Sequence, residues 1–167
     1  SPDIPLHKVV FLDRDGTLND NVAGYVRSWG DFRFNHGAVL ALRLLYDAGY
    51  EIVIVSNQAC VGDGVVSMDA FLEIHSAMLR AMSAAGVRIY KSLYCLHGKL
   101  DGCACRKPKT GLLARFSEHV NFERSEVYLV GDRVSDIEAG AAFGLRTALV
   151  RTGYGAFAER EFRGRIY

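Results

Sequence analysis

Residues 8–19 read KVVFLDRDGTLN, a short and mostly apolar run that leads into two aspartates one position apart. The apolar part, Lys8–Leu12, is rich in β-branched and aromatic side chains, which is typical of a strand buried on both faces of a parallel sheet. Asp13 and Asp15 then follow at the carboxyl end of this strand. Ligands of open α/β sheets bind outside that edge, so the stretch predicts both the type of fold and the position of a site.

Similar apolar runs recur along the chain and alternate with segments of helical periodicity. Further strands are expected at residues 51–55, 89–94, 127–130 and 147–150, and helices at 38–48, 68–85, 112–118 and 136–143. Gly49, Gly86 and Gly144 follow three of these helices, as helix-terminating glycines do, and Ser67 is a plausible N-cap. Repeated β-then-α units predict an α/β fold with a doubly wound parallel sheet, formed by residues 1–167 as a single domain.

Two segments do not follow this alternation. Residues 19–35 form a long irregular stretch after the first strand, and such stretches in compact domains are usually functional. Residues 157–167 are expected to form a short helix or a loose tail.

The composition is that of an ordinary globular protein, with 167 residues, 50% hydrophobic residues and a formal net charge of +1. This charge gives no reason to expect nucleic-acid or membrane binding. No apolar run approaches the roughly 20 residues that a membrane span needs. Four cysteines, three of them clustered, fit a reducing compartment better than a secreted disulfide framework. We therefore expect a cytoplasmic protein, and a monomer.

Distinctive polar residues follow four of the predicted strands. They are Asp13 and Asp15; Ser56, Asn57 and Gln58; Arg106 and Lys107; and Asp132, Arg133 and Asp136. Each group alone could be a turn, a helix cap or a solvated surface charge. Together, at the same edge of one sheet, they predict a single crevice.

The residue types in this crevice suit phosphoryl transfer. Carboxylates such as Asp13, Asp15 and Asp132 are the ligands that Mg²⁺ prefers, and a carboxylate can also attack phosphorus. Lys107 and Ser56 could hold the oxygens of a transferred phosphoryl group. A second carboxyl group could protonate the leaving oxygen and then activate water.

Residues 95–105, CLHGKLDGCAC, predict a second metal site. Cys95, His97, Cys103 and Cys105 offer three thiolates and one imidazole, a closed tetrahedral set typical of structural Zn²⁺. The alternatives are a disulfide or unrelated thiols. A disulfide within Cys-x-Cys closes a strained ring, and a reducing compartment disfavours any bridge. Zinc would fix the backbone directly before Arg106 and Lys107.

With these motifs in place, the sequence resembles the haloacid dehalogenase superfamily of phosphohydrolases. The resemblance rests on Asp13-Arg14-Asp15-Gly16-Thr17, then Ser56, then Lys107, then Gly131-Asp132 with Asp136. It implies that Asp13 is the nucleophile, that Asp15 is the general acid/base, and that Asp13, the Asp15 carbonyl and Asp132 hold Mg²⁺. It also implies that Asp136 orients the site, that the sheet order is 3-2-1-4-5 with the nucleophile on the central strand, and that no large cap domain is present.

A narrower resemblance is to the heptose-1,7-bisphosphate phosphatases and to the histidinol-phosphate phosphatases of the same branch. It rests on Ser56-Asn57-Gln58, the Cys/His loop and Cys105-Arg106-Lys107-Pro108. It implies that a small phosphorylated sugar is the substrate, with hydrolysis at C7. The substrate contacts implied are Asn57, Gln58, Arg106, Arg133, Gly24 and Tyr25.

Three other functions stay open from the sequence. A histidinol-phosphate phosphatase could use Asp20, Asp31 or Asp63 for the positive groups of its substrate, and Asp63 departs from the pattern of the heptose enzymes. A nucleic-acid 3′-end phosphatase is disfavoured by the neutral net charge. A noncatalytic zinc-stabilised binding module is disfavoured by the intact pair of Asp13 and Asp15.

Overall fold

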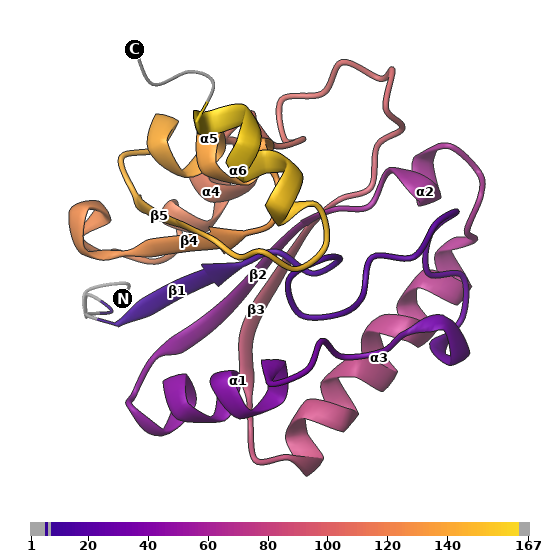
Figure 1. Cartoon of the computed structure of the whole chain (residues 1–167), viewed down its shortest axis with the longest axis horizontal. Helices are drawn as coiled ribbons and strands as arrows, with labels where there is room; N and C mark the ends of the chain where they lie inside the picture. Colours follow the sequence, from indigo (N-terminus) through magenta and orange to yellow (C-terminus); the bar gives the residue numbers. More distant parts are fainter. Residues whose placement is uncertain (1–5, 7, 164–167) are drawn as a thin grey trace.

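The computed structural model describes residue 6 and residues 8–163 of the chain. Its centre is a five-stranded parallel sheet in the order β3-β2-β1-β4-β5 (Figure 1). The strands are β1 (Val9–Leu12), β2 (Glu51–Asn57), β3 (Ile89–Cys95), β4 (Tyr128–Gly131) and β5 (Arg146–Leu149). This confirms the predicted fold class and strand order, with β1 in the middle.

Helices cover both faces of the sheet (Figure 1). The α-helices are α1 (Ala38–Asp47), α2 (Ala59–Gly62), α3 (Met68–Ala84), α4 (Gly111–Ser117), α5 (Val134–Ala142) and α6 (Gly155–Arg163), and the 3-10 helices are η1 (Trp29–Asp31) and η2 (Arg124–Glu126). Helices α1 and α3 lie on one face, and α4, α5 and α6 lie on the other. The sheet is therefore doubly wound.

The alternating side chains of β1 explain why its sequence is apolar throughout. Val10 and Leu12 pack into one core cluster together with side chains of α1 and α3. Val9 and Phe11 point to the opposite face and pack with side chains of α4. All four β1 residues are buried, which is the environment that a continuous apolar strand requires.

The structure confirms several of the helix ends predicted from the sequence. Gly49, Gly86 and Gly144 adopt positive φ angles of 88°, 81° and 81°, which glycine tolerates best, and so end their helices as expected. The Ser67 hydroxyl accepts a hydrogen bond from the Ala70 amide at 3.1 Å and caps α3. Helix α6 begins two residues before the predicted tail, whose residues 164–167 lie outside the described part.

The long irregular segment 19–35 runs next to the carboxyl end of β1. An antiparallel bridge joins Asn19 to Phe34, and the Asn35 side-chain Nδ2 donates to the Thr17 carbonyl at 2.9 Å. The segment is thereby fastened beside the predicted site. Among the described residues, no helix is both long and apolar enough to span a membrane.

Candidate active site

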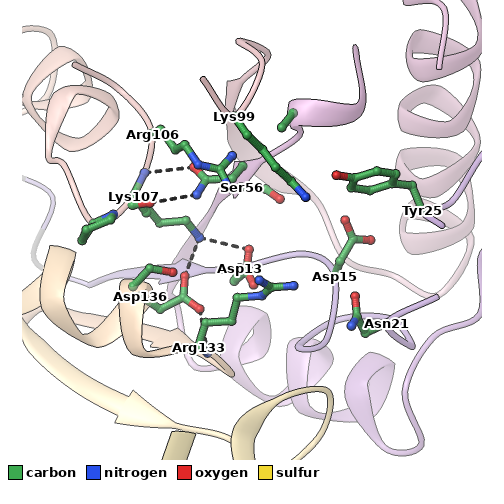
Figure 2. A pocket seen from close by; sticks show the side chains of 14 residues that line it. Asp13, Asp15, Asn21, Tyr25, Ser56, Lys99, Arg106, Lys107, Arg133 and Asp136 are labelled. Carbon is green, nitrogen blue, oxygen red and sulfur yellow. Dashed lines mark hydrogen bonds and ion pairs between the residues drawn. The ribbon is translucent and has the colours of Figure 1, made fainter. Parts of the chain in front are cut away.

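A cavity of about 330 Å³ lies at the carboxyl edge of the sheet (Figure 2). Its lining comprises Asp13, Asp15, Asn21, Tyr25, Ser56, Asn57, Ala59, Lys99, Arg106, Lys107, Pro108, Arg133, Ser135 and Asp136. Nine of these were predicted as site residues from the sequence. The lining also includes three polar residues that were not predicted, Asn21, Lys99 and Ser135. Gly24 and Gln58 were expected to contact substrate but do not line the cavity.

Lys107 joins two buried carboxylates at the floor of the cavity. Its Nζ donates to Asp13 Oδ1 at 3.0 Å and to Asp136 Oδ1 at 2.5 Å (Figure 2). It also donates to the Val55 carbonyl at 2.7 Å. The Asp136 carboxylate also accepts a hydrogen bond from the Arg133 amide at 3.1 Å. Asp136 therefore contacts both the lysine and the start of α5, and the orienting role that the resemblance implies for it stays a prediction.

Burial sets the proton affinities of this cluster. It raises the pKa of Asp13 to about 6, and the nearby Asp132 acts in the same direction against the opposing Lys107. Burial likewise raises the pKa of Asp136 to about 6, with Asp13 adding to the effect. Burial alone would lower the pKa of Lys107, but Asp13 and Asp136 outweigh it and raise that pKa above its ordinary value. The lysine is thus a permanent cation in the site.

Asp132 lies directly behind the cavity and carries an unused oxygen. It is fully buried, and its Oδ2 accepts a hydrogen bond from the Tyr154 amide at 2.9 Å. Its Oδ1 is buried without a hydrogen-bond partner. Single carboxylate oxygens of Asp13, Asp132 and Asp136 all lie within 4.8 Å of one another. An unpartnered carboxylate oxygen in an all-oxygen cluster suits a divalent cation such as Mg²⁺.

The glycine at position 16 makes room for the Asp132 carboxylate. A Cβ atom at Gly16 would lie 2.1 Å from Asp132 Oδ2, and the φ angle of Gly16 is +90°. Any other side chain would therefore clash with a predicted metal ligand and would also be strained.

Ser56 and Asn57 come from the end of β2 and have different contacts. Ser56 is buried at the cavity wall, and its hydroxyl accepts from Gln58 Nε2 at 2.8 Å. The Asn57 side chain donates to the Lys107 carbonyl and accepts from the Lys107 amide, both at 3.0 Å. Asn57 lines the cavity, so its predicted substrate contact stays a prediction, and its side-chain amide also holds the backbone of Lys107.

The four predicted zinc ligands come together at the end of β3. Cys105 Sγ lies 3.2 Å from Cys95 Sγ and 3.1 Å from His97 Nδ1, and Cys95 Sγ lies 3.6 Å from both Cys103 Sγ and His97 Nδ1. Zn–S bonds of about 2.3 Å in a tetrahedron place sulfurs about 3.8 Å apart, so the cluster is close to zinc size. All four cysteines of the chain are free thiols, which rules out the disulfide alternative in this structure.

The Cys/His loop also contributes Lys99 to the cavity. The Lys99 ammonium lies 5.6 Å from the centre of the Tyr25 ring, and the two side chains approach each other at the cavity mouth (Figure 2). Asp63 supports the loop from α2, since it accepts from the Lys99 amide at 3.5 Å. Asp63 does not line the cavity, so its carboxylate does not face the space where the positive groups of a histidinol substrate would lie.

Comparisons with known proteins agree with this geometry. A family model described as HAD-hydrolase-like matches residues 104–164. The chain is 37% identical over 163 residues to the D-glycero-beta-D-manno-heptose-1,7-bisphosphate 7-phosphatase of Haemophilus influenzae, covering 93% of this chain and 88% of that protein. It is 38% identical over 155 residues to the enzyme of the same name from Pasteurella multocida, with coverages of 89% and 84%.

A solved structure is similar over the same length. The D,D-heptose 1,7-bisphosphate phosphatase of B. bronchiseptica, complexed with magnesium and phosphate, superposes with a TM-score of 0.89 at 31% identity, covering 92% of this chain and 86% of that one. The catalytic motif order, the strand order and these relatives agree. The chain is a phosphatase of the haloacid dehalogenase superfamily and belongs to the branch of the heptose-1,7-bisphosphate 7-phosphatases.

Proposed function

We propose that this chain is a Mg²⁺-dependent phosphomonoester hydrolase that removes the C7 phosphate of D-glycero-D-manno-heptose 1,7-bisphosphate through a phosphate ester of Asp13. The observation that carries the proposal is the position of Asp13 at the cavity floor, 3.0 Å from the buried cation of Lys107. This places a carboxylate nucleophile and a fixed positive charge at one point, as phosphoryl transfer requires.

Each polar residue of the cavity has its own role in the proposed reaction. Asp13 attacks phosphorus, while Lys107 and Ser56 hold the phosphoryl oxygens. Asp15 gives its proton to the leaving sugar oxygen and then takes a proton from the water that hydrolyses the aspartyl phosphate. Asp13, Asp132 and the Asp15 carbonyl would hold Mg²⁺. When bound, the ion neutralises charge on the phosphoryl oxygens.

The Cys/His cluster would hold Zn²⁺ in a structural role. Four protein ligands leave no open position for water, so this metal would supply no chemistry. The zinc would affect the reaction only indirectly. It would fix the backbone at Cys105, which immediately precedes Arg106 and Lys107.

The charges at the cavity favour a substrate with a second phosphate. Lys99, Arg106 and Arg133 line the cavity beyond Lys107, and Arg106 Nη1 is buried without a hydrogen-bond partner. All acidic side chains in the lining, Asp13, Asp15 and Asp136, belong to the catalytic group. An anionic distal group therefore fits this lining better than the ammonium and imidazole groups of histidinol phosphate.

The deciding experiment compares substrates side by side. We would measure kcat/KM for phosphate release from both anomers of heptose 1,7-bisphosphate and from histidinol phosphate, with Mg²⁺ present. A strong preference for one heptose anomer is expected, and Arg106→Met should raise KM for it while the exposed Arg80→Met, as control, leaves KM unchanged. Much faster turnover of histidinol phosphate would overturn the substrate assignment. Full activity of Asp13→Asn would overturn the mechanism.

We also propose that residues 1–167 act as one domain, as a monomer and in the cytoplasm. The clustering of Cys95, Cys103 and Cys105 with His97 as a metal site, rather than a disulfide framework, supports a reducing compartment. Light scattering of the purified protein would test the oligomeric state.

A further inference from the structure

Arg14, the residue between the two catalytic aspartates, is buried in the core. It is 1% exposed and is the largest of the fully buried side chains among the described residues. Its guanidinium faces the Phe32 ring at 5.9 Å, and it does not line the cavity. Burying a guanidinium is costly unless it is paired, so its contacts need an explanation.

Nearly all of those contacts go to Asp15. Arg14 Nη2 donates to both carboxylate oxygens of Asp15 at 3.0 Å, and Arg14 Nε donates to Oδ1 at 3.2 Å. The same Nη2 donates to Gln58 Oε1 at 3.1 Å. Such a forked contact fixes the plane of a carboxylate as well as its distance.

Two amides complete the arrangement around Asp15. Gln58 Nε2 donates to Oδ2 at 2.8 Å, and Asn19 Nδ2 donates to Oδ1 at 2.8 Å. Arg14, Gln58 and Asp15 therefore form a closed ring of hydrogen bonds. The Asp15 side chain remains 24% exposed, on the cavity side, whereas the Arg14 side chain is only 2% exposed.

The fold alone does not explain this arginine. Arg14 Nη1 is buried without a hydrogen-bond partner, a defect that lowers stability. A buried charge with an unused donor is expected where the site, rather than the core, requires it.

We infer that Arg14 is a positioning residue that holds the Asp15 carboxyl group toward the leaving oxygen and acts on the reaction only through Asp15, with Gln58 as its partner in the ring. This inference rests on the proposed role of Asp15 as general acid/base. Gln58, which the sequence analysis expected to contact substrate, would instead hold the Asp15 carboxylate through its side-chain amide.

A double-mutant cycle tests the inference in the full chain loaded with Mg²⁺. Arg14→Met is expected to lower kcat about a hundredfold, since small displacements of a reacting group have effects of this size, with KM nearly unchanged because Arg14 does not reach the cavity. In an Asp15→Asn background, Arg14→Met should change kcat less than about twofold. Arg14→Lys restores the charge but not the fork, so most of the loss should remain.

The controls separate positioning from folding. Arg43→Met removes an exposed arginine paired with Asp47 on α1 and should leave kcat unchanged. If Arg14→Met fails to fold, Gln58→Leu tests the same ring and should lower kcat in the wild-type background but not in Asp15→Asn. An equal loss of kcat in both backgrounds, or none in either, overturns the inference. Wild-type activity of Asp15→Asn would instead overturn the proposed mechanism.

Discussion

Lys107 Nζ and Asp13 Oδ1 lie 3.0 Å apart although 94 residues separate them in the chain. The remaining donors of the ammonium go to Asp136 and to the Val55 carbonyl, so a single cation connects β2 with the segments that follow β1 and β4. Three buried charges of mixed sign can stay in the core only because each satisfies another. The floor of the cavity therefore also holds three segments of the fold together.

Lys107→Met should destabilise the protein as well as inactivate it. The change leaves Asp13 and Asp136 buried without their cation, and breaking a buried pair in this way costs about 3–5 kcal/mol. Urea denaturation would measure the free energy of unfolding. Lys8→Met, at an exposed lysine that donates to the Ala48 carbonyl, is the matched control and should change it little. Equal stability of the two variants would show that Lys107 contributes only to catalysis.

The stability difference between wild type and Asp13→Asn should depend on pH in metal-free buffer. Burial raises the pKa of Asp13 to about 6 from its ordinary 3.8, so the folded wild type binds this proton more readily than the unfolded chain does. Its stability relative to Asp13→Asn must then fall as pH rises from about 4 to 6 and level off above. Thermal unfolding in EDTA between pH 4 and 8 measures the difference, and parallel curves would contradict the expectation.

Removal of zinc should inactivate the enzyme without touching the catalytic carboxylates. The ligand set ends at Cys105, so its loss frees the backbone of Arg106 and Lys107. We expect one zinc per chain by elemental analysis, and Cys103→Ser should lose zinc, melt at a lower temperature and have a lower kcat. Cys60→Ala, at a buried cysteine outside the cluster, should keep its zinc. Full zinc content in Cys103→Ser would contradict the assigned ligand set.

Gly16→Ala should weaken magnesium binding. The new Cβ would lie 2.1 Å from Asp132 Oδ2 and displace that carboxylate. The Mg²⁺ concentration for half-maximal activity is expected to rise about 10- to 100-fold, as it does when the surroundings of a metal ligand are disturbed.

Gly37→Ala is a matched control for this substitution. Gly37 also has a positive φ angle, +79° against +90° at Gly16, but a Cβ there meets nothing within 4 Å. Both variants bear similar backbone strain, and only Gly16→Ala bears the clash. A similar Mg²⁺ requirement in the two variants would mean that strain, rather than displacement of Asp132, is responsible.

The sequence predicted the fold well because the core of each strand is encoded locally. The β1 residues Val9–Leu12 are apolar on both faces, and both faces are covered. Strand ends also predicted where the cavity lies, since parallel strands bring their carboxyl ends to one edge. The four-residue helix α2 was missed because so short a segment shows no clear periodicity.

Side-chain roles behind the cavity could not be predicted in this way. Asn57 was expected at the cavity and does line it, but its hydrogen bonds to the Lys107 backbone, 50 residues away in the chain, were not foreseen. Arg14 received no role, because arginine is rarely buried and nothing adjacent in the sequence shows that Gln58 lies beside it. Such contacts depend on which segments tertiary packing brings together.

The central position of β1 has a consequence for the newly synthesised chain. Asp13 is synthesised well before its neighbours in the site, which are Lys107, Asp132 and finally Tyr154, whose amide donates to Asp132. The proposed nucleophile therefore has none of these three neighbours until the chain has been extended by more than 90 residues beyond it. A nascent chain stopped before β4 has no partner for one side of β1, and under the proposed mechanism we expect it to release no phosphate, because Asp132 is still missing.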